Sequence, residues 1–504
     1  MKNLSSGPSS PAADTSTDAG LVRSGAVLAC VSFATVLVVG LVAAINLAVP
    51  MFAASDLHPG ASQLLWIVDA YVVAFACLVI PGGAAGDRFG RKGVLTAGLV
   101  VVALGAAACA AAPSIGLLLA ARAITGIGAA LVLPNCVGVL VHATPPERRA
   151  RTLGTWGVVS GMGGLVGNTA GAALLAVTGT WQSLFIATVP IALAGAIWVS
   201  RVVPRSTRTP RHLDPLGTVL LILATVAVLI GVIEGPELGW DNGIVVTAFG
   251  CGVVLIAAWT WSGLRSDHPL LDPRLFRIPL LSASSLGMFV MFFGSFGLFY
   301  LNASLLQYVR GYSVLQAGLS VLPLAAPLLL GSRFVPGLVA RFGIPTVLTI
   351  AFAAIGSGLI GLSTAMHQPY LAYAAWLVIV GTGFALALPC LSAELAVALP
   401  PHQAGIAGGL QSITRELGSA LGVAVVGTIV TSSFAANLAG SPRSHEPVPH
   451  TVAEALAASF IEHRAVLDAF ADAAATGLRW AGVLTVAAGL AVITVAVRAS
   501  AEAQ

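Results

Sequence analysis

The chain consists of long apolar runs separated by short segments that contain Pro, Gly or charged residues. The runs reach roughly 20 residues or more, which is the length that a helix needs to cross the apolar core of a bilayer. They are continuous and do not alternate with polar residues, so they predict helices and exclude the strands of a membrane β-barrel. The fourteen expected spans are 24–49, 62–84, 93–112, 115–141, 152–176, 182–202, 215–234, 243–263, 281–307, 313–332, 345–365, 370–394, 404–430 and 479–499.

The composition supports this pattern. Of the 504 residues, 57% are hydrophobic and only 9% are Asp, Glu, Lys or Arg, whereas a soluble domain carries about 25% charged residues. An ordinary soluble enzyme, a nucleic-acid-binding protein and a disordered chain are therefore excluded, and an all-α polytopic membrane protein is predicted. The segment 1–23 is rich in Ser, Gly, Thr and Pro and is expected to be a cytoplasmic, flexible tail. No removable leader is expected, because the first apolar run is long and no cleavage site follows it.

The positions of Lys and Arg predict the orientation, because basic residues concentrate in cytoplasmic segments. With the N-terminus inside, eighteen basic residues fall in inner segments and four in outer ones. We therefore expect both termini in the cytoplasm and the spans in the plasma membrane. The long outer segment 431–478 contains an amphipathic stretch, 452–474, which is expected to lie as a separate helix on the outer surface. That helix is either a passive connector or an accessory lid.

Three short strings occur twice in register. The shift carries spans 2–5 onto spans 10–13, so two six-helix bundles, 24–203 and 281–504, are expected to run in the same direction, separated by an inserted pair of helices within 204–280. Parallel repeats of this kind occur in transporters, which bind substrate between the two halves. The repeated strings are GIGAALVLP at 126–134 and GTGFALALP at 381–389, Pro145-Pro146 and Pro400-Pro401, and Arg88-Phe89-Gly90 and Arg341-Phe342-Gly343.

The loop between spans 2 and 3 carries the most specific motif, Gly86-Asp87-Arg88-Phe89-Gly90-Arg91-Lys92. The glycines permit a tight turn and close helix approach, and Asp87 can pair with the basic cluster and so latch neighbouring helix ends. A basic cytoplasmic loop with incidental turn glycines is the alternative interpretation. The motif resembles the loop signature of the major facilitator superfamily.

With fourteen spans, the resemblance is to the drug:proton antiporter branch of that family. Trp66-Ile67-Val68-Asp69-Ala70-Tyr71 is similar to helix 2 of its quaternary-ammonium multidrug exporters. The branch usually has an acid in helix 1, within a string resembling LDxTxVNxALP. Here the run 40–50 is GLVAAINLAVP, so Leu41 stands in place of the acid and recognition of dications is in doubt. Further landmarks that resemble the branch are Asp214 before Leu216-Gly217, Pro269-Leu270, Leu275-Phe276-Arg277 and Gln316-Ala317-Gly318-Leu319.

The fifth span carries small residues at spacings of three and four, which place them on one helix face and permit close backbone contact with another helix. In the family, the matching stripe is the antiporter motif, with Gly-Pro followed by Gly-Gly. Here Asn168 stands for the proline and Ala172 for the last glycine, so tight packing is expected without a proline-dependent bend. A coupling role and a plain packing face both remain open. The stripe comprises Gly154, Gly157, Gly161, Gly164, Gly167, Asn168 and Gly171.

Ionisable groups within a membrane are costly, so they are candidates for function. Asp69 and Arg122 each lie about seven residues from the outer end of their spans, at a common depth of roughly 10 Å. A guanidinium favours the ionised form of a carboxylate and removal from water favours the neutral form, so a movement of Arg122 could switch proton uptake and release at Asp69. The alternative is a structural ion pair that only fixes helix register.

The second candidate pair is Arg415-Glu416, near mid-membrane in span 13. Glu416 shares a helix face with small residues, which suits a cavity wall, and related exporters resembling this chain have an acid at the matching position. A local pair turned away from the cavity is the alternative. Glu234 and Glu394 are expected to be solvated helix ends. Aromatic candidates for lining a pocket or stacking on a cation are Trp66, Tyr71, Phe299, Tyr300 and Trp376.

Together these features predict a proton-coupled secondary exporter of drug-like amphiphiles. Its partners are expected to be a small-molecule substrate, protons and the lipid bilayer, and the resemblance implies a functional monomer. No ATP-binding GxxxxGK[ST] loop, cofactor motif, metal cluster or nucleophile elbow occurs, so neither an ATP-driven pump nor an enzyme is expected. The alternative is a dedicated exporter of one metabolite or self-made antibiotic. A channel or a membrane sensor is more remote.

Overall fold

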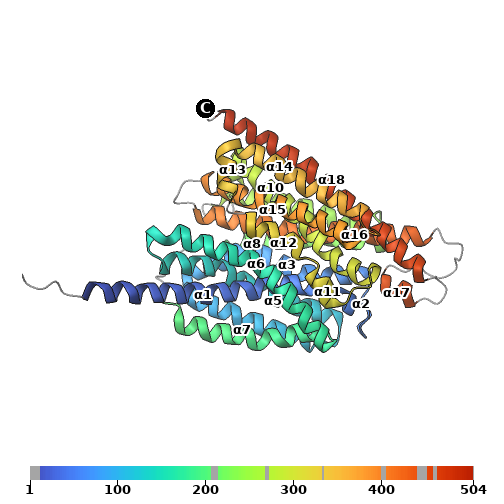
Figure 1. The fold of residues 1–504 in the computed structure, drawn as a ribbon, viewed down its shortest axis with the longest axis horizontal. Helices are drawn as coiled ribbons and strands as arrows, with labels where there is room; N and C mark the ends of the chain where they lie inside the picture. The colour runs from blue at the N-terminus through green and yellow to red at the C-terminus, as the bar shows by residue number, and fades with distance from the viewer. Residues whose placement is uncertain are drawn as a thin grey trace, which may run out of the picture.

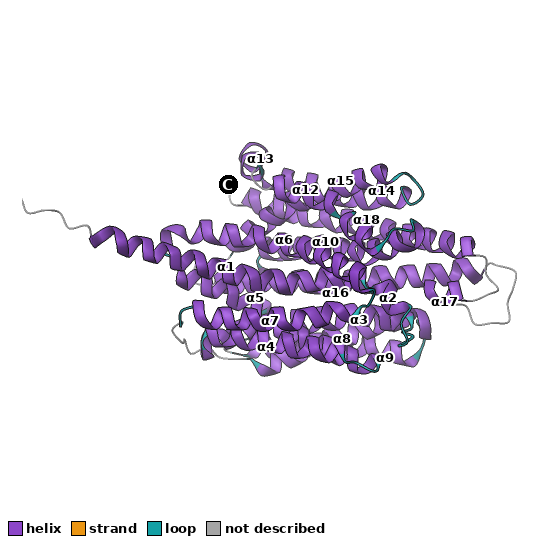
Figure 2. Cartoon of the chain, turned by 60° about the horizontal axis from the view of Figure 1, so that its bottom comes forward, coloured by secondary structure: helices purple, strands orange, loops and turns teal. Residues whose placement is uncertain are grey.

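The computed structural model describes residues 12–205, 214–266, 269, 272–331, 334–398, 404–439, 451–457 and 463–502. Helices are the only regular elements within these ranges (Figure 2). The N-terminal bundle and inserted pair contain α1 (Ala12–Leu47), α2 (Val49–Ala53), α3 (Ala61–Phe89), α4 (Arg91–Ala110), α5 (Ile115–Ala143), α6 (Pro146–Thr178), α7 (Gln182–Val202), α8 (Pro215–Leu238) and α9 (Gly243–Arg265). The C-terminal bundle contains η1 (Pro273–Arg277), α10 (Pro279–Ser304), η2 (Leu305–Val309), α11 (Val314–Leu319), α12 (Leu322–Gly331), α13 (Val335–Phe342), α14 (Ile344–Thr364), α15 (Tyr370–Val397), α16 (Ala404–Ala439), α17 (Val452–Ala457) and α18 (His463–Glu502).

The all-α membrane fold is confirmed. Among the described residues, twelve helices are long and apolar enough to cross a membrane. The other two predicted spans coincide with shorter apolar helices, Met162–Thr178 in α6 and Val314–Leu328 across α11 and α12, so fourteen spans are compatible with the structure. The second of these is interrupted between Leu319 and Leu322. Pro323 follows this break, and because proline has no N–H it cannot continue the hydrogen bonds of a preceding helix.

Two expectations at the chain ends differ from the structure. Helix α1 already begins at Ala12, within the predicted tail 1–23, because extending an existing helix needs no new nucleation. The separate surface helix expected at 452–474 is wrong: α17 is short, and from His463 onward the chain belongs to α18, the last span. Phe470 anchors this first part of α18, where its ring lies 6.1 Å from Phe434 and 6.2 Å from Tyr308, measured between centroids.

The sequence repeat is also a repeat of backbone contacts. A Cβ atom on Gly126 of α5 would collide with the carbonyl oxygen of Tyr71 in α3, and one on Gly381 of α15 would collide with the carbonyl oxygen of Leu324 in α12. The same correspondence holds two residues further along each helix, where Gly128 meets Gly98 and Val102, and Gly383 meets Ala351 and Ile355. These contacts support two equivalent bundles; the predicted boundaries at 203 and 281 stay a prediction.

The inserted helices α8 and α9 pack against each other, and α8 also contacts both bundles. Trp66 of α3 donates a hydrogen bond to Glu234 (3.3 Å), and Thr428 of α16 donates one to the carbonyl oxygen of Val232 (2.9 Å). Glu234 is therefore not simply a solvated helix end. Glu394 is buried and accepts a hydrogen bond from Ser284 (2.9 Å), so the same expectation is wrong for it.

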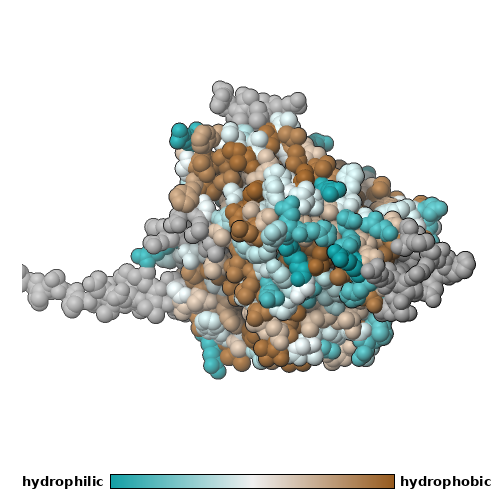
Figure 3. Space-filling model, turned by 45° about the vertical axis from the view of Figure 1, so that its right-hand side comes forward, coloured by the Kyte–Doolittle hydropathy of each residue, from teal (hydrophilic) through white to brown (hydrophobic). Residues whose placement is uncertain are grey.

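The long helices run side by side along the long axis of the molecule (Figure 1). We call the end with the turn at Gly90 the Gly90 end, and the opposite end, with α17, the α17 end. Hydrophobic residues cover much of the visible flank, and hydrophilic residues gather toward the α17 end (Figure 3). This distribution is expected for a bundle with lipid around its sides and water at its ends.

A first prediction concerns the repeated crossings. Gly126→Ala and Gly381→Ala should each destabilise the protein by about 1–3 kcal/mol, because a methyl group would force two backbones apart. Gly116→Ala is the matched control, since no atom lies within 4 Å of a Cβ at that position of α5. Thermal unfolding of the purified variants in detergent measures the difference. A melting temperature of Gly126→Ala or Gly381→Ala equal to that of the control would contradict the close crossing.

Candidate functional site

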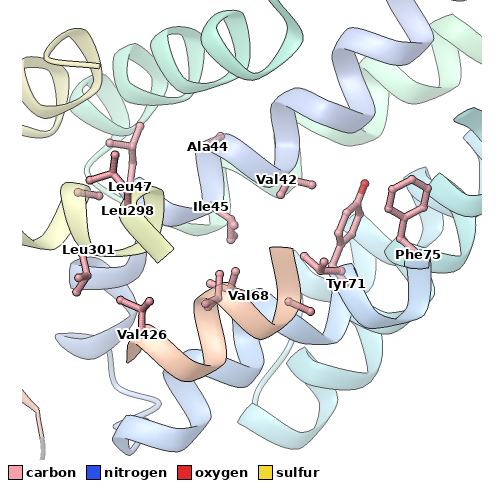
Figure 4. Close-up of a cluster of buried hydrophobic side chains, with 14 of the residues drawn as sticks. Val42, Ala44, Ile45, Leu47, Val68, Tyr71, Phe75, Leu298, Leu301 and Val426 are labelled. Carbon is pink, nitrogen blue, oxygen red and sulfur yellow. The ribbon is translucent and has the colours of Figure 1, made fainter. Parts of the chain in front are cut away.

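Tyr71 lies where α3 meets α1 and α5. Its hydroxyl donates a hydrogen bond to the carbonyl oxygen of Val38 (3.2 Å), and its ring faces Phe75 at 6.3 Å between centroids. Figure 4 shows the side chain pointing from α3 toward α1, close to Val42. The ring is fully buried and so forms a fixed surface inside the N-terminal bundle.

Arg122 rests on this surface. Its Cζ lies 4.8 Å from the centroid of the Tyr71 ring, and its Nε donates a hydrogen bond to the carbonyl oxygen of Ile67 (2.8 Å). Within the described chain, its two terminal nitrogens have no hydrogen-bond partner. A buried guanidinium with free donors is costly unless it is paired. Arg122 is therefore held in place by a carbonyl and a ring while two of its nitrogens stay available.

Asp69 does not pair with Arg122 in this conformation. Both carboxylate oxygens are buried, and neither has a hydrogen-bond partner among the described residues. The physical reason is helical geometry: Arg122 contacts Ile67 and Tyr71, and a residue two positions from each lies on the opposite face of the helix. Asp69 instead shares a face with Leu65, whose side chain packs on Gly427 of α16. The two groups therefore face different neighbours, and their common depth stays a prediction.

Arg415 and Glu416 form an ion pair in α16, with 2.6 Å between Nε and Oε1. The side chain of Glu416 is 8% exposed, and the guanidinium of Arg415 lies 5.8 Å from the centroid of the Phe292 ring of α10. Because α16 packs against α3, this pair lies on a helix next to the one that carries Asp69 and Tyr71.

The loop motif forms a latch between α3, α4 and α5. Asp87 and Arg91 form an ion pair of 2.7 Å, and Gly90 has φ +103°, which favours glycine. Gly86 packs on the side chain of Asn135, whose Nδ2 donates a hydrogen bond to the carbonyl oxygen of Gly82 (3.0 Å). Arg88 lies over Phe89 at 5.5 Å from its centroid and is exposed, and the side chain of Lys92 is half-buried.

The C-terminal bundle repeats part of this loop. Arg341 lies 5.2 Å from the centroid of Phe342, and Gly343 also has a positive φ, of +76°. Ala340 occupies the position that matches Asp87, so the acid–base latch belongs to the N-terminal bundle.

The small-residue stripe of α6 serves two partners. Gly167 packs against the backbone of Gly40 in α1, and Gly171 lies against Ala44 of the same helix. Asn168 faces the other bundle, where its Nδ2 donates a hydrogen bond to the carbonyl oxygen of Gly318 in α11 (2.7 Å). The predicted single face therefore divides between two partners, and Gly164 makes looser contact with α1. Gly157 and Gly161 lie in α6, and their surroundings are outside the part of the helix that the structure describes.

Sequence reasoning missed Asn135 and Gly163. Asn135 is a polar residue one position after the repeated string that ends at Pro134, and it connects α5 to α3 through its bond to Gly82. Gly163 lies against Val36 and Val39 of α1. Its spacing of four to Gly167 and eight to Gly171 was a signal that could have found it. No group of three metal-ligating side chains occurs within the described part of the chain.

Comparison with known proteins identifies the family of this chain. The sequence pattern of the Major Facilitator Superfamily matches residues 31–423, which is most of the chain and extends from α1 into α16. The chain belongs to the Major Facilitator Superfamily. It is therefore a multi-pass membrane protein, and members of this superfamily are transporters of small molecules rather than enzymes.

Relatives within the superfamily are similar over most of their length. The methylenomycin A resistance protein of Streptomyces coelicolor is 32% identical over 374 residues, covering 74% of this chain and 78% of that protein. The multidrug resistance protein Stp of Mycobacterium tuberculosis is 30% identical over 404 residues, covering 80% and 75%. A bacterial homologue of the human lysosomal transporter Spinster, solved in an inward-facing and unoccupied conformation, has the same fold with a TM-score of 0.66 at 18% identity, covering 94% and 97%.

A second prediction tests the contacts of Arg122 with the Tyr71 ring and the Ile67 carbonyl. Arg122→Lys keeps the charge but loses the planar group that lies on Tyr71 and the Nε bond to Ile67. We expect the variant to transport substrate about tenfold more slowly than the wild type, or slower still. A tenfold change corresponds to a free energy of about 1.4 kcal/mol. Tyr71→Phe is the matched control, because it keeps the ring and loses only the bond to Val38. Equal rates for Arg122→Lys and wild type, at equal amounts in the membrane, would contradict the prediction.

Proposed function

We propose that this chain is a proton-coupled exporter of amphiphilic drugs or antibiotics. Its relatives are named for resistance to methylenomycin A and to multiple drugs, and those names support an export function here. The observation that carries the proton coupling is Asp69, a carboxylate that is buried between the bundles without a hydrogen-bond partner in the described chain. The protein would work as a monomer in the plasma membrane, without a cofactor.

The proposed orientation places the Gly90 end and both termini in the cytoplasm, because the basic residues concentrate there. The contacts that join the bundles near the α17 end support a closed outer side in this conformation. At the α17 end, Gln307 donates a hydrogen bond to the carbonyl oxygen of Leu47 (3.2 Å), Leu65 packs on Gly427, and Asn168 is bonded to Gly318. An amphiphile would enter from the inner side while these contacts hold the outer side closed.

Coupling would follow from the cost of a buried charge. An ionised Asp69 without a donor is unfavourable in an apolar interface, whereas a protonated or cation-paired Asp69 is tolerated. Arg122 has two nitrogens available, so a movement of α5 against α3 could bring them to the carboxylate and release the proton. A proton entering down a potential of 100 mV supplies about 2.3 kcal/mol, which would drive the rocking of the bundles.

The Arg415–Glu416 pair would complete this arrangement on the side of the C-terminal bundle. Because α16 packs against α3, binding of a cation at Glu416 would alter the electric field near Tyr71 and Arg122. Protonation at Asp69 and substrate binding at Glu416 would thus be linked. The latch of Asp87 and Arg91 and the packing of α6 on α1 would keep each bundle rigid during rocking.

A third prediction tests the proton site. Asp69→Asn should abolish proton-driven drug efflux while folded protein remains in the membrane, because the amide cannot release a proton. Efflux of a fluorescent dye from energised cells, with and without a protonophore, measures the effect. Asp472→Asn removes an exposed carboxylate of α18 and is the control. Protonophore-sensitive efflux at the wild-type rate from Asp69→Asn would refute the assignment.

A dedicated exporter of a single antibiotic is the second candidate, favoured by the similarity to the methylenomycin A resistance protein. Leu41 bears on the choice of substrates, because it is a buried apolar residue where the resembling exporters have an acid. Without that carboxylate, a dication would lose one of its counter-charges inside the membrane.

A fourth prediction follows. Cells that lack other pumps and express this chain should become resistant to several unrelated monovalent amphiphilic cations but not to dications. The measurement is the inhibitory concentration of each compound, compared with cells that express Asp69→Asn. Protection against one antibiotic alone would favour the dedicated exporter, and protection against dications would contradict the role given to Leu41.

A further inference from the structure

A pocket at the α17 end lies between the two bundles and extends beneath α17. It is lined from the N-terminal bundle by α2 and the start of α3, and from the other bundle by α10, η2, α16 and α18. Several hydroxyl groups line this pocket, although most of its lining residues are apolar. They belong to Tyr300, Ser304, Tyr308, Thr431 and Thr451.

Tyr300 connects this pocket with Asp69 by its position along α10. Gly297 packs on Val426 and Gly422 packs on Phe293, so α10 and α16 run in parallel, and Leu65 packs on Gly427 near the level of Leu298. Tyr300 lies two residues beyond that level toward the α17 end, and Asp69 lies four residues beyond it toward the Gly90 end. At 1.5 Å of rise per residue, the two are separated by about 9 Å along the helix axes.

The side chains close most of this separation. Side chains on a helix lean toward its N-terminus. Because α10 and α3 run in opposite directions, Tyr300 leans toward the Gly90 end and Asp69 leans toward the α17 end. Tyr300 lines the pocket, and its phenol and the unpartnered carboxylate of Asp69 lean toward each other along the helix axes.

Apolar side chains seal this level against water. Leu47, Leu298, Leu301 and Val426 converge from three helices and are all buried (Figure 4). A proton that comes from the pocket to Asp69 must therefore cross a layer rich in hydrocarbon, and a hydroxyl side chain within this layer can carry it.

Other charged or titratable groups near Asp69 are engaged elsewhere. Arg122 of α5 is held by Ile67 and Tyr71, and Glu416 of α16 is paired with Arg415. Glu234 of α8 accepts the hydrogen bond from Trp66. Further titratable groups on α3 and on the elements packed against it include Tyr71, Cys77, Asp87 and Arg88 of α3, Arg91, Lys92 and Cys109 of α4, Cys136 and His142 of α5, Cys30 of α1, and Tyr308 of the neighbouring η2.

We propose that Tyr300 is the proton relay between the pocket at the α17 end and Asp69. This inference rests on the proposed proton-coupled function. The hydroxyl proton of Tyr300 passes to a carboxylate oxygen of Asp69, and the phenolic oxygen takes a proton from a hydronium ion in the pocket. Tyr300 ends neutral, Asp69 gains one proton, and water is left behind. The route explains how Asp69 receives protons from outside while the contacts between the bundles exclude bulk water.

Reconstituted full-length protein tests the relay with two measurements on Tyr300→Phe. The first is exchange of labelled ethidium across proteoliposomes at equal pH on both sides, which needs no net proton transfer. The second is ethidium transport driven by a pH jump. We expect exchange within twofold of wild type and pH-driven transport at least tenfold slower. Tyr312→Phe is the matched control, because Tyr312 also lies at the α17 end, against Tyr370, but does not line the pocket.

Each outcome decides between the proposals. Wild-type pH-driven transport in Tyr300→Phe would overturn the relay, and so would an equal loss of exchange and pH-driven transport, which would assign Tyr300 to substrate passage or folding. If wild-type protein itself exchanged ethidium but did not respond to the pH jump, the proton-coupled function would fail. Slow pH-driven transport in Tyr300→Phe alone, with Tyr312→Phe at the wild-type rate, would support the relay.

Discussion

Close backbone contact between helices is the constraint on which this structure depends. In a bilayer, helices gain little from hiding apolar side chains, because lipid is as apolar as the protein interior. They associate where small residues let two backbones touch. In this chain, Gly126 touches the carbonyl of Tyr71, and Gly167 touches Gly40. The same contacts that hold each bundle together also place Tyr71, and with it Arg122, at a fixed depth.

This constraint explains how charge can be kept inside an apolar protein. Arg122 is tolerated because the α3–α5 crossing brings the Ile67 carbonyl and the Tyr71 ring within its reach. Asp69, two residues away on the same helix, is turned toward the other bundle and finds no donor there in the described chain. One helix thus separates a charge with some partners from a charge with none among the described residues. The group without any partner has the most to gain from a change in the arrangement of the bundles, which is the property that the proposed coupling role requires.

Much of the fold could be predicted from the sequence because membrane helices are encoded locally. Run length gave the spans, and the repeat of 126–134 at 381–389 gave the two bundles. The candidate site was harder to predict, because depth follows from position along one helix whereas pairing depends on rotation about its axis. Asp69 and Arg122 were placed at a common depth but not on their separate faces. The continuation of α18 back to His463 also escaped prediction, since it depends on the distant contact of Phe470 with Phe434.

The bonds of α8 have a mechanical consequence. One helix holds Trp66 of the N-terminal bundle through Glu234, and Thr428 of the C-terminal bundle through Val232, within a single helical turn. Because both bundles are bonded to neighbouring residues of α8, they can rotate about this point but cannot easily separate there. If the bundles rock as proposed, α8 would therefore act as a pivot on the flank of the molecule. In a chain with only the two six-helix bundles, the axis of rocking would be set by their mutual interface alone, whereas here α8 would fix it from the side.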